Sequence, residues 1–144
     1  MFLNNYHHSF DDKFRLTIPA KFREIPEGAF VVKGLDRNLM VLPPEVFQVL
    51  LDHLAAMSIT NPKVRQLRQS ILGFADKVMP DANGRILIQQ NLRDLAGLKR
   101  EVVLVGMGDY FEIWSEELWQ KQQELINNDQ TNEDRYAAID LTLR

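Results

Sequence analysis

Residues 11–18 read Asp-Asp-Lys-Phe-Arg-Leu-Thr-Ile, and residues 81–88 read Asp-Ala-Asn-Gly-Arg-Ile-Leu-Ile. Three further blocks match in the same order: Phe22-Arg23 with Leu92-Arg93, Val31 and Gly34 with Val103 and Gly106, and Glu45-Val46-Phe47 with Glu117-Leu118-Trp119. A chance match would not keep its order through four blocks. The sequence therefore predicts two copies of one unit of roughly forty-five residues.

The sequence of each copy predicts the same order of elements, β-α-β-β-α. The Asp-x-x-x-Arg stretch is a turn, because an Asp side chain can accept hydrogen bonds from its own turn and Asn83-Gly84 favours a hairpin. A short strand follows, then a helical segment, two apolar strands and the start of an amphipathic helix. The helical segments are expected at 20–24 and 91–95, and the apolar strands at 30–32, 39–42, 102–105 and 110–114.

The two copies are joined by helices. Asn61-Pro62 is a helix start, and the apolar stripe after it consists of Val64, Leu67, Ile71 and Phe74. We therefore divide the chain into a first unit at 5–47, linking helices at 48–75, a second unit at 76–119, and a C-terminal helix end with an acidic tail at 120–144. Residues 127–133 are polar and are expected to fray. The aromatic residues at apolar repeat positions are expected in the core: Phe22, Phe47, Phe74, Phe111, Trp114 and Trp119.

The composition is that of a globular protein, with 45% apolar and 26% charged residues in a chain of 144. The absence of cysteine excludes disulfides, thiol nucleophiles and zinc–thiolate sites. No apolar run reaches the ~20 residues of a membrane span, and no secretory signal is visible. We expect a cytosolic protein without a membrane partner.

The charge is unevenly distributed. The chain has 17 Lys and Arg against 20 Asp and Glu, a net charge of −3. Residues 1–100 hold 14 of these cations and 10 of the anions, whereas residues 101–144 hold 3 and 10. A mildly basic front is therefore followed by an acidic end. An anionic partner would have to be bound by individually placed residues rather than by a general field.

Patterns that resemble enzyme or metal motifs are incomplete. The turn at Asp81 lacks the glutamate of a calcium loop, and Gly106-Met107-Gly108 lacks the third glycine of a nucleotide loop. His7 and His8 are consecutive on an expected strand and would point to opposite faces. We predict no metal, no cofactor, no small-molecule substrate, no catalytic residues and no enzymatic activity.

The repeated Asp-x-x-x-Arg turn is the strongest candidate site. An arginine at a hairpin tip suits phosphate contact and bidentate recognition of guanine. In the first copy Lys13 and Arg15, with Lys21 and Arg23 just beyond, add local positive charge. A purely structural role is an open alternative, in which each Asp shapes its turn and each Arg pairs with that Asp or with one from another chain.

Four stretches resemble the MraZ family of bacterial transcriptional regulators. They are the N-terminal Met1-Phe2-Leu3, the run at 10–23 together with 81–88, and the block at 104–114 that reads Leu-Val-Gly-Met-Gly-Asp-Tyr-Phe-Glu-Ile-Trp. The resemblance extends from residue 1 to about residue 126. It implies two tandem AbrB-like half-domains of the swapped-hairpin type, which we expect to form a mixed, mainly β fold with short helices and a small barrel-like core.

The resemblance also implies a function. Family members form homo-oligomeric rings and bind promoter DNA with repeated sites, typically in the promoter of their own division and cell-wall operon. The expected location is the cytoplasm, in association with the nucleoid. A ring that binds no nucleic acid is the alternative, and the net charge of −3 favours it.

The expected roles of single residues follow from the two turns. Arg15 and Arg85 would contact base edges or phosphates, with Lys13 as a phosphate contact. Asp11, Asp81 and Gly84 would shape the turns, and Lys21 and Arg23 would be additional phosphate contacts. The chain departs from the family pattern at Phe14, where glycine is favoured, and at Asn4-Asn5. Phe14 implies a first turn that is either distorted or stabilised by the ring packing on a neighbour.

Overall fold

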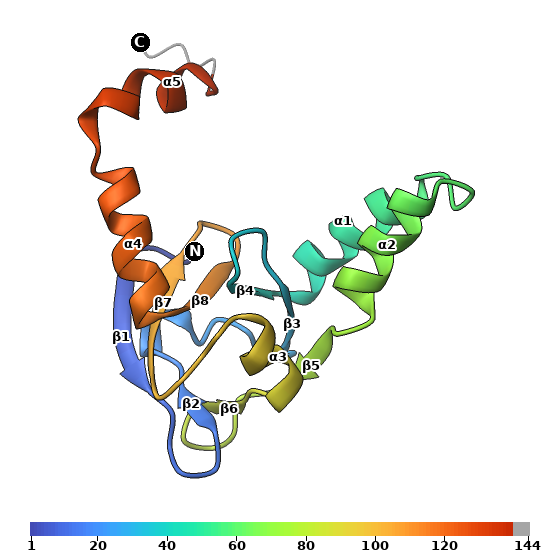
Figure 1. Cartoon of the computed structure of the whole chain (residues 1–144). Coiled ribbons are helices and arrows are strands. Elements are labelled where there is room, and N and C mark those ends of the chain that lie inside the picture. The colour runs from blue at the N-terminus through green and yellow to red at the C-terminus, as the bar shows by residue number, and fades with distance from the viewer. Residues whose placement is uncertain (140–144) are drawn as a thin grey trace.

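The computed structural model describes residues 1–139, and its strands form two antiparallel sheets (Figure 1). The larger sheet has six strands in the order β1 (Asn5–Ser9), β7 (Glu101–Gly106), β8 (Phe111–Ser115), β4 (Leu39–Leu42), β3 (Ala29–Lys33) and β5 (Asp76–Val78). The smaller sheet is a ribbon of β2 (Arg15–Thr17) and β6 (Arg85–Leu87). The predicted mainly β class is confirmed.

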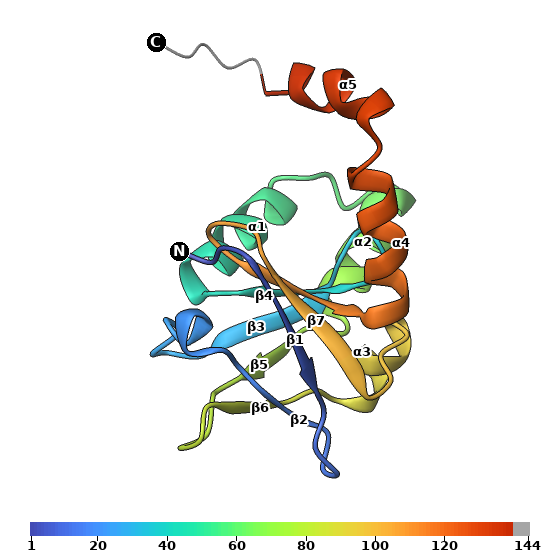
Figure 2. The same ribbon diagram turned by 90° about the vertical axis from the view of Figure 1, so that its left-hand side faces the viewer.

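Short helices accompany the sheets. They are the 3₁₀ turn η1 (Ala20–Phe22), α1 (Pro44–Ala55), α2 (Pro62–Leu72), α3 (Gln90–Leu95), α4 (Glu116–Ile126), the 3₁₀ turn η2 (Asp129–Thr131) and α5 (Asn132–Ala137). Helices α1 and α2 project as one arm, and α4 leads into α5 as a second arm (Figures 1 and 2). Within residues 1–139, none of these helices is long and apolar enough to cross a bilayer.

The repeat is visible as an internal pseudo-twofold symmetry. Leu16 pairs with Ile86, its counterpart seventy positions later, the spacing that separates Asp11 from Asp81. Met40 pairs with Glu112, its counterpart seventy-two positions later, the spacing that separates Val31 from Val103. Each copy keeps one hairpin of its own, β3–β4 or β7–β8. The remaining pairings, β1 with β7, β3 with β5, β4 with β8 and β2 with β6, join one copy to the other. The two copies therefore complete each other's sheets.

Side chains alternate along the strands and separate the core into an inner and an outer part. Residues such as Val31, Leu104 and Ile113 point inward, where they pack with Leu16 and Ile86 of the ribbon. On the outer face the Phe30 and Phe47 rings stack with centroids 4.1 Å apart and anchor α1. The rings of Trp114 and Trp119 likewise anchor α4, at 5.5 Å.

The predicted barrel-like core is wrong, because the sheet does not close. Strands β1 and β5 are counterparts in the repeat, and they stand at the two ends of the six-strand order. The pseudo-axis passes between β4 and β8 and therefore keeps these two edges apart. The β2–β6 ribbon packs against the inner face as a separate sheet, and among residues 1–139 only the isolated bridge between Phe10 and Leu16 connects it to the end of β1. The division of the chain at 5–47, 48–75, 76–119 and 120–144 stays a prediction.

Three local expectations also differ from the structure. The first helical segment, expected at 20–24, is the single 3₁₀ turn η1. Phe74 is 40% exposed, because α2 ends at Leu72 and Phe74 lies beyond the end of this helix, whereas the other aromatics assigned to the core are buried. The segment at 127–133 is not frayed, since it forms η2 and the start of α5. Arg135 stabilises it by donating to the carbonyl oxygens of Leu125 and Asn128.

Candidate nucleic-acid interface

The first Asp–Arg turn is built around the carboxylate of Asp11. Its Oδ1 accepts hydrogen bonds from the backbone N–H groups of Lys13 and Arg15, both at 2.9 Å. Its Oδ2 accepts from Nε of Arg15 at 2.7 Å. The backbone closes the turn, because the N–H of Phe14 donates to the Asp11 carbonyl oxygen at 3.0 Å. One side chain therefore fixes both the loop and the arginine.

The second turn repeats this geometry. Oδ1 of Asp81 accepts from the N–H groups of Asn83 and Arg85 at 2.9 Å, and Oδ2 accepts from Nε of Arg85 at 2.9 Å. The N–H of Gly84 donates to the Asp81 carbonyl oxygen at 2.9 Å. Gly84 has φ of 73° and Phe14, its counterpart in the first turn, has φ of 59°. Asp11 and Asp81 thus accept the hydrogen bonds that close the two turns, and Gly84 lies in the left-handed region.

The antiparallel β2–β6 ribbon places one turn at each of its two ends (Figure 2). Its register pairs Arg15 with Leu87 and Thr17 with Arg85, so each arginine lies at one end of the ribbon. Nη1 of Arg85 is 3.9 Å from Oδ2 of Asp11, which links the turns electrostatically. Both turns project from the end of the molecule opposite the helical arms (Figures 1 and 2).

Both aspartates are held in their charged form. Hydrogen bonding from the backbone N–H of Arg15 is the main cause that lowers the pKa of Asp11, and the backbone N–H of Arg85 does the same for the pKa of Asp81. A lowered pKa contributes stability above the ordinary value of 3.8, and this stability is lost as the pH falls through the lowered value. The turns are therefore fully formed at neutral pH.

The arginines remain accessible although each is anchored to an aspartate. The side chain of Arg15 is 31% exposed and that of Arg85 is 27% exposed. Only Nε of each guanidinium donates a hydrogen bond within residues 1–139, so the outer Nη groups keep their hydrogen-bonding capacity, although Nη1 of Arg85 lies 3.9 Å from Oδ2 of Asp11. A guanidinium fixed at Nε loses little freedom when its outer N–H groups bind. The arrangement suits a phosphate oxygen or a guanine edge.

Each turn is covered by an arginine from the other copy. Nε of Arg23 donates to the carbonyl oxygen of Ile18 at 2.8 Å, and this guanidinium fills the space beside Gly84, where a Cβ would lie 2.5 Å from Nε. Arg93 is the counterpart of Arg23, and its Cζ lies 3.6 Å from the centroid of the Phe14 ring. The first turn has the same hydrogen bonds as the second, so it is not distorted. Its phenylalanine ring is stabilised by packing on the Arg93 guanidinium.

The other predicted contacts divide into two groups. Lys13 is exposed on the first turn, and Arg23 belongs to the second turn through its contact with Gly84. Lys21 instead lines a hollow with Asn4 and Tyr6, beside β1. Sequence reasoning missed Arg93, although its alignment with Arg23 was a signal that could have found it. Within residues 1–139 no group of three or more His, Asp or Glu side chains is placed to hold a metal ion.

The fold and the site define a class: two interleaved copies of one unit that present paired Asp–Arg turns at a common end. The family model described as "MraZ protein, putative antitoxin-like" matches residues 1–69 and 71–140. The chain belongs to the MraZ family.

Relatives that share most of their length with this chain carry the same name. A protein of Thermomicrobium roseum is 43% identical over 88% of this chain and 89% of its own length. One of Corynebacterium efficiens is 44% identical over 86% and 87%, and one of Mycolicibacterium smegmatis is 39% identical over 100% and 98%. All three are named "Transcriptional regulator MraZ".

Proposed function

We propose that this protein is a sequence-specific DNA-binding transcriptional regulator. The observation that carries the proposal is the pair of aspartate-anchored arginines, Arg15 and Arg85, on the two turns that flank the β2–β6 ribbon. The names of the relatives support the same class. Because the whole chain has an excess of negative charge, placed cations of this kind are the means by which it can bind a polyanion.

Each residue of the turns has a role in this proposal. Arg15 and Arg85 donate their outer N–H groups to base edges or phosphates, and Lys13 contacts a phosphate. Asp11, Asp81 and Gly84 hold the turns in shape. Arg23 contributes charge beside the second turn, and Lys21 is the most peripheral of the phosphate contacts.

A single copy of the chain presents a small footprint, so useful affinity requires several subunits on repeated sites. We propose that a ring of subunits binds direct repeats in the promoter of its own division and cell-wall operon, in the cytoplasm at the nucleoid. The alternative is a ring without a nucleic-acid role, in which the turns serve assembly. In this structure Nε of each arginine pairs with the aspartate of its own turn, which favours the first proposal.

Arg15→Ala tests the proposal when DNA affinity and oligomer size are measured on the same sample. One lost base contact costs about 1–3 kcal/mol, and the loss recurs in every subunit on a repeat. Specific binding should therefore fall to background while the oligomer persists. Arg85→Ala should weaken binding equally if both turns face DNA and less if the first turn dominates.

Lys121→Ala is the matched control, because it removes one exposed cation from α4, on the arm opposite the turns. Dissociation of the oligomer by Arg15→Ala would assign Arg15 to assembly. Unchanged affinity with an intact oligomer would remove it from the DNA site.

A further inference from the structure

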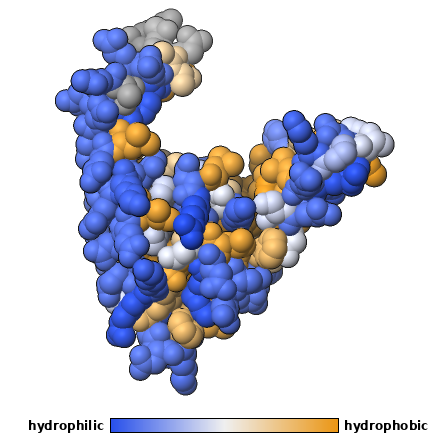
Figure 3. Space-filling view, in the orientation of Figure 1, coloured by the Kyte–Doolittle hydropathy of each residue, from blue (hydrophilic) through white to orange (hydrophobic). Residues whose placement is uncertain are grey.

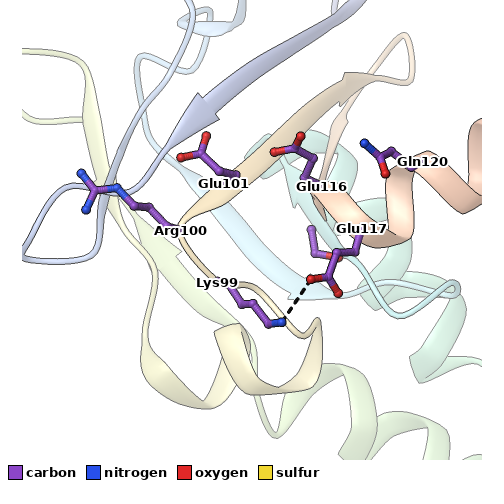
Figure 4. A pocket seen from close by; sticks show the side chains of 7 residues that line it. Lys99, Arg100, Glu101, Glu116, Glu117 and Gln120 are labelled. Atoms are coloured by element: carbon purple, nitrogen blue, oxygen red, sulfur yellow. Dashed lines mark hydrogen bonds and ion pairs between the residues drawn. The ribbon is translucent and has the colours of Figure 1, made fainter.

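A loop of the second copy lies beside the first turn. It connects α3 to β7, and the carbonyl oxygen of Arg100 accepts a hydrogen bond from the N–H of Phe10 at 2.9 Å. Lys99 and Arg100 of this loop share a hollow with Asp12, Phe14 and other residues of the first turn. Figure 4 shows the Arg100 side chain extended away from α4 and toward the ribbon of the N-terminal segment.

The cationic side chains around this hollow differ in whether they already form ion pairs, hydrogen bonds or ring contacts within the protein. Nζ of Lys99 pairs with Oε1 of Glu117 at 3.1 Å, and Arg93 stacks on Phe14 while donating to the carbonyl oxygen of Ile88. Arg100 is exposed, and its side chain makes no hydrogen bond or ion pair within the described residues 1–139. Arg100 is therefore the cation whose charge is fully available to a partner.

The corresponding loop of the first copy has the opposite character. At the seventy-two-residue offset, Lys99 corresponds to Glu27 and Arg100 to Gly28. The backbone is arranged in the same way beside both turns, since Ser9 pairs with Glu101 and Val78 pairs with Ala29. The fold therefore accepts either charge at this position, and the basic loop flanks only the first turn.

We propose that Arg100 is a phosphate contact that extends the first turn, so that the first turn is the stronger of the two DNA contacts. This inference rests on the proposed function. An exposed guanidinium on the hollow lined by Asp12 and Phe14 of the first turn meets the backbone of the same DNA segment that Arg15 reads. A phosphate contact adds affinity to every DNA sequence alike, whereas Arg15 distinguishes between sequences.

Arg100→Ala tests this proposal, with affinity measured as a function of salt on a promoter fragment and on a shuffled fragment. Each phosphate contact adds about 0.9 to the slope of log affinity against log salt, which corresponds to about a tenfold change in affinity at 0.1 M salt. We expect a loss of that size on both fragments and a shallower slope. Arg100→Lys should restore the slope, and Lys121→Ala should leave affinity and slope unchanged.

The outcomes separate the two proposals. Failure of the parent protein to bind any DNA would overturn the proposed function. Normal binding by the parent together with an unchanged slope for Arg100→Ala would overturn only the role of Arg100. A loss restricted to the promoter fragment would show that Arg100 reads bases and would equally reject a phosphate contact. Circular dichroism and oligomer size on the same samples verify that each variant is folded.

Discussion

At the scale of single residues, the first turn stores strain and compensates for it. Phe14 has φ of 59°, in the left-handed region, which costs an L-residue about 1–2 kcal/mol. The guanidinium of Arg93 lies 3.6 Å above the exposed Phe14 ring, and a cation–π contact of this kind contributes about 0.5–1 kcal/mol. The backbone strain at Phe14 and the cation–π contact of its ring therefore oppose each other and are of similar size.

Substitutions at Phe14 separate these effects. Phe14→Ala keeps the left-handed strain and loses the stack, so its free energy of unfolding should fall by about 0.5–1 kcal/mol. Phe14→Gly loses the stack and also relieves the strain, so it should stay within about 1 kcal/mol of the parent and retain DNA binding. Urea denaturation of the parent and of both variants measures the order of their free energies of unfolding. An alanine variant as stable as the glycine variant would show that φ at this position carries no strain.

Much of the turn could be predicted from sequence because its contacts are local. Asp11 and Arg15 are four residues apart, and the Asp-x-x-x-Arg spacing alone indicates a side chain that closes its own turn. The cover provided by Arg23 and Arg93 could not be predicted in this way. Each of these arginines reaches the turn of the other copy, and that proximity exists only after β2 has paired with β6.

At the scale of elements, β8 carries a carboxylate on an otherwise apolar face. Glu112 is 8% exposed, lies opposite Met40, and its Oε1 accepts a hydrogen bond from Nε1 of Trp114 at 3.0 Å. Burial raises the pKa of Glu112 above the ordinary value of 4.5. The folded state therefore binds more protons than the unfolded state between these values, and stability falls as the pH rises through that window.

Glu112→Gln should consequently stabilise the protein at pH 7. Glutamine keeps an acceptor for Trp114 and removes the cost of burying a charge, so the free energy of unfolding should rise. We expect a rise of at most about 1 kcal/mol, which is the size of the net contribution of one hydrogen bond. Thermal unfolding at pH 7 and below pH 4.5 measures it. The advantage of the variant should shrink at the lower pH, and an equal advantage at both would contradict a charged Glu112.

Helix starts could be predicted better than strand partners, for a physical reason. The Asn61 side chain accepts from the N–H of Lys63, and the Ser115 side chain accepts from the N–H of Leu118. Each helix cap therefore depends on residues at most three positions apart in the sequence. The pairing of β1 with β7 involves residues about a hundred positions apart, and no local pattern encodes it. The barrel was therefore mispredicted although the strands of the ribbon and of both hairpins were placed; the edge strand β5 was not predicted.

At the scale of the whole molecule, the surface favours self-association. Strands β1 and β5 each leave one edge without a partner within residues 1–139. Apolar side chains are exposed on the α1–α2 arm, among them Val49, Ile59 and Leu67. Figure 3 shows apolar surface on this arm and between the two arms.

We therefore expect a homo-oligomer larger than a dimer. Light scattering coupled to gel filtration at micromolar concentration measures the mass directly. The chain has a mass of 16.7 kDa, and a single species of that mass would contradict the prediction. Assembly should also survive in Lys121→Ala, whose substitution lies outside the exposed apolar set.

The interleaving of the two copies has a consequence for synthesis on the ribosome. Asn5 pairs with Val105, so the first strand leaves the exit tunnel a hundred residues before its partner. At about 5–20 residues per second, the nascent chain waits roughly 5–20 s with that strand unsatisfied. A prematurely terminated product has neither β7 nor β8 to complete its sheet. Completion of translation is thus a condition for forming the six-stranded sheet.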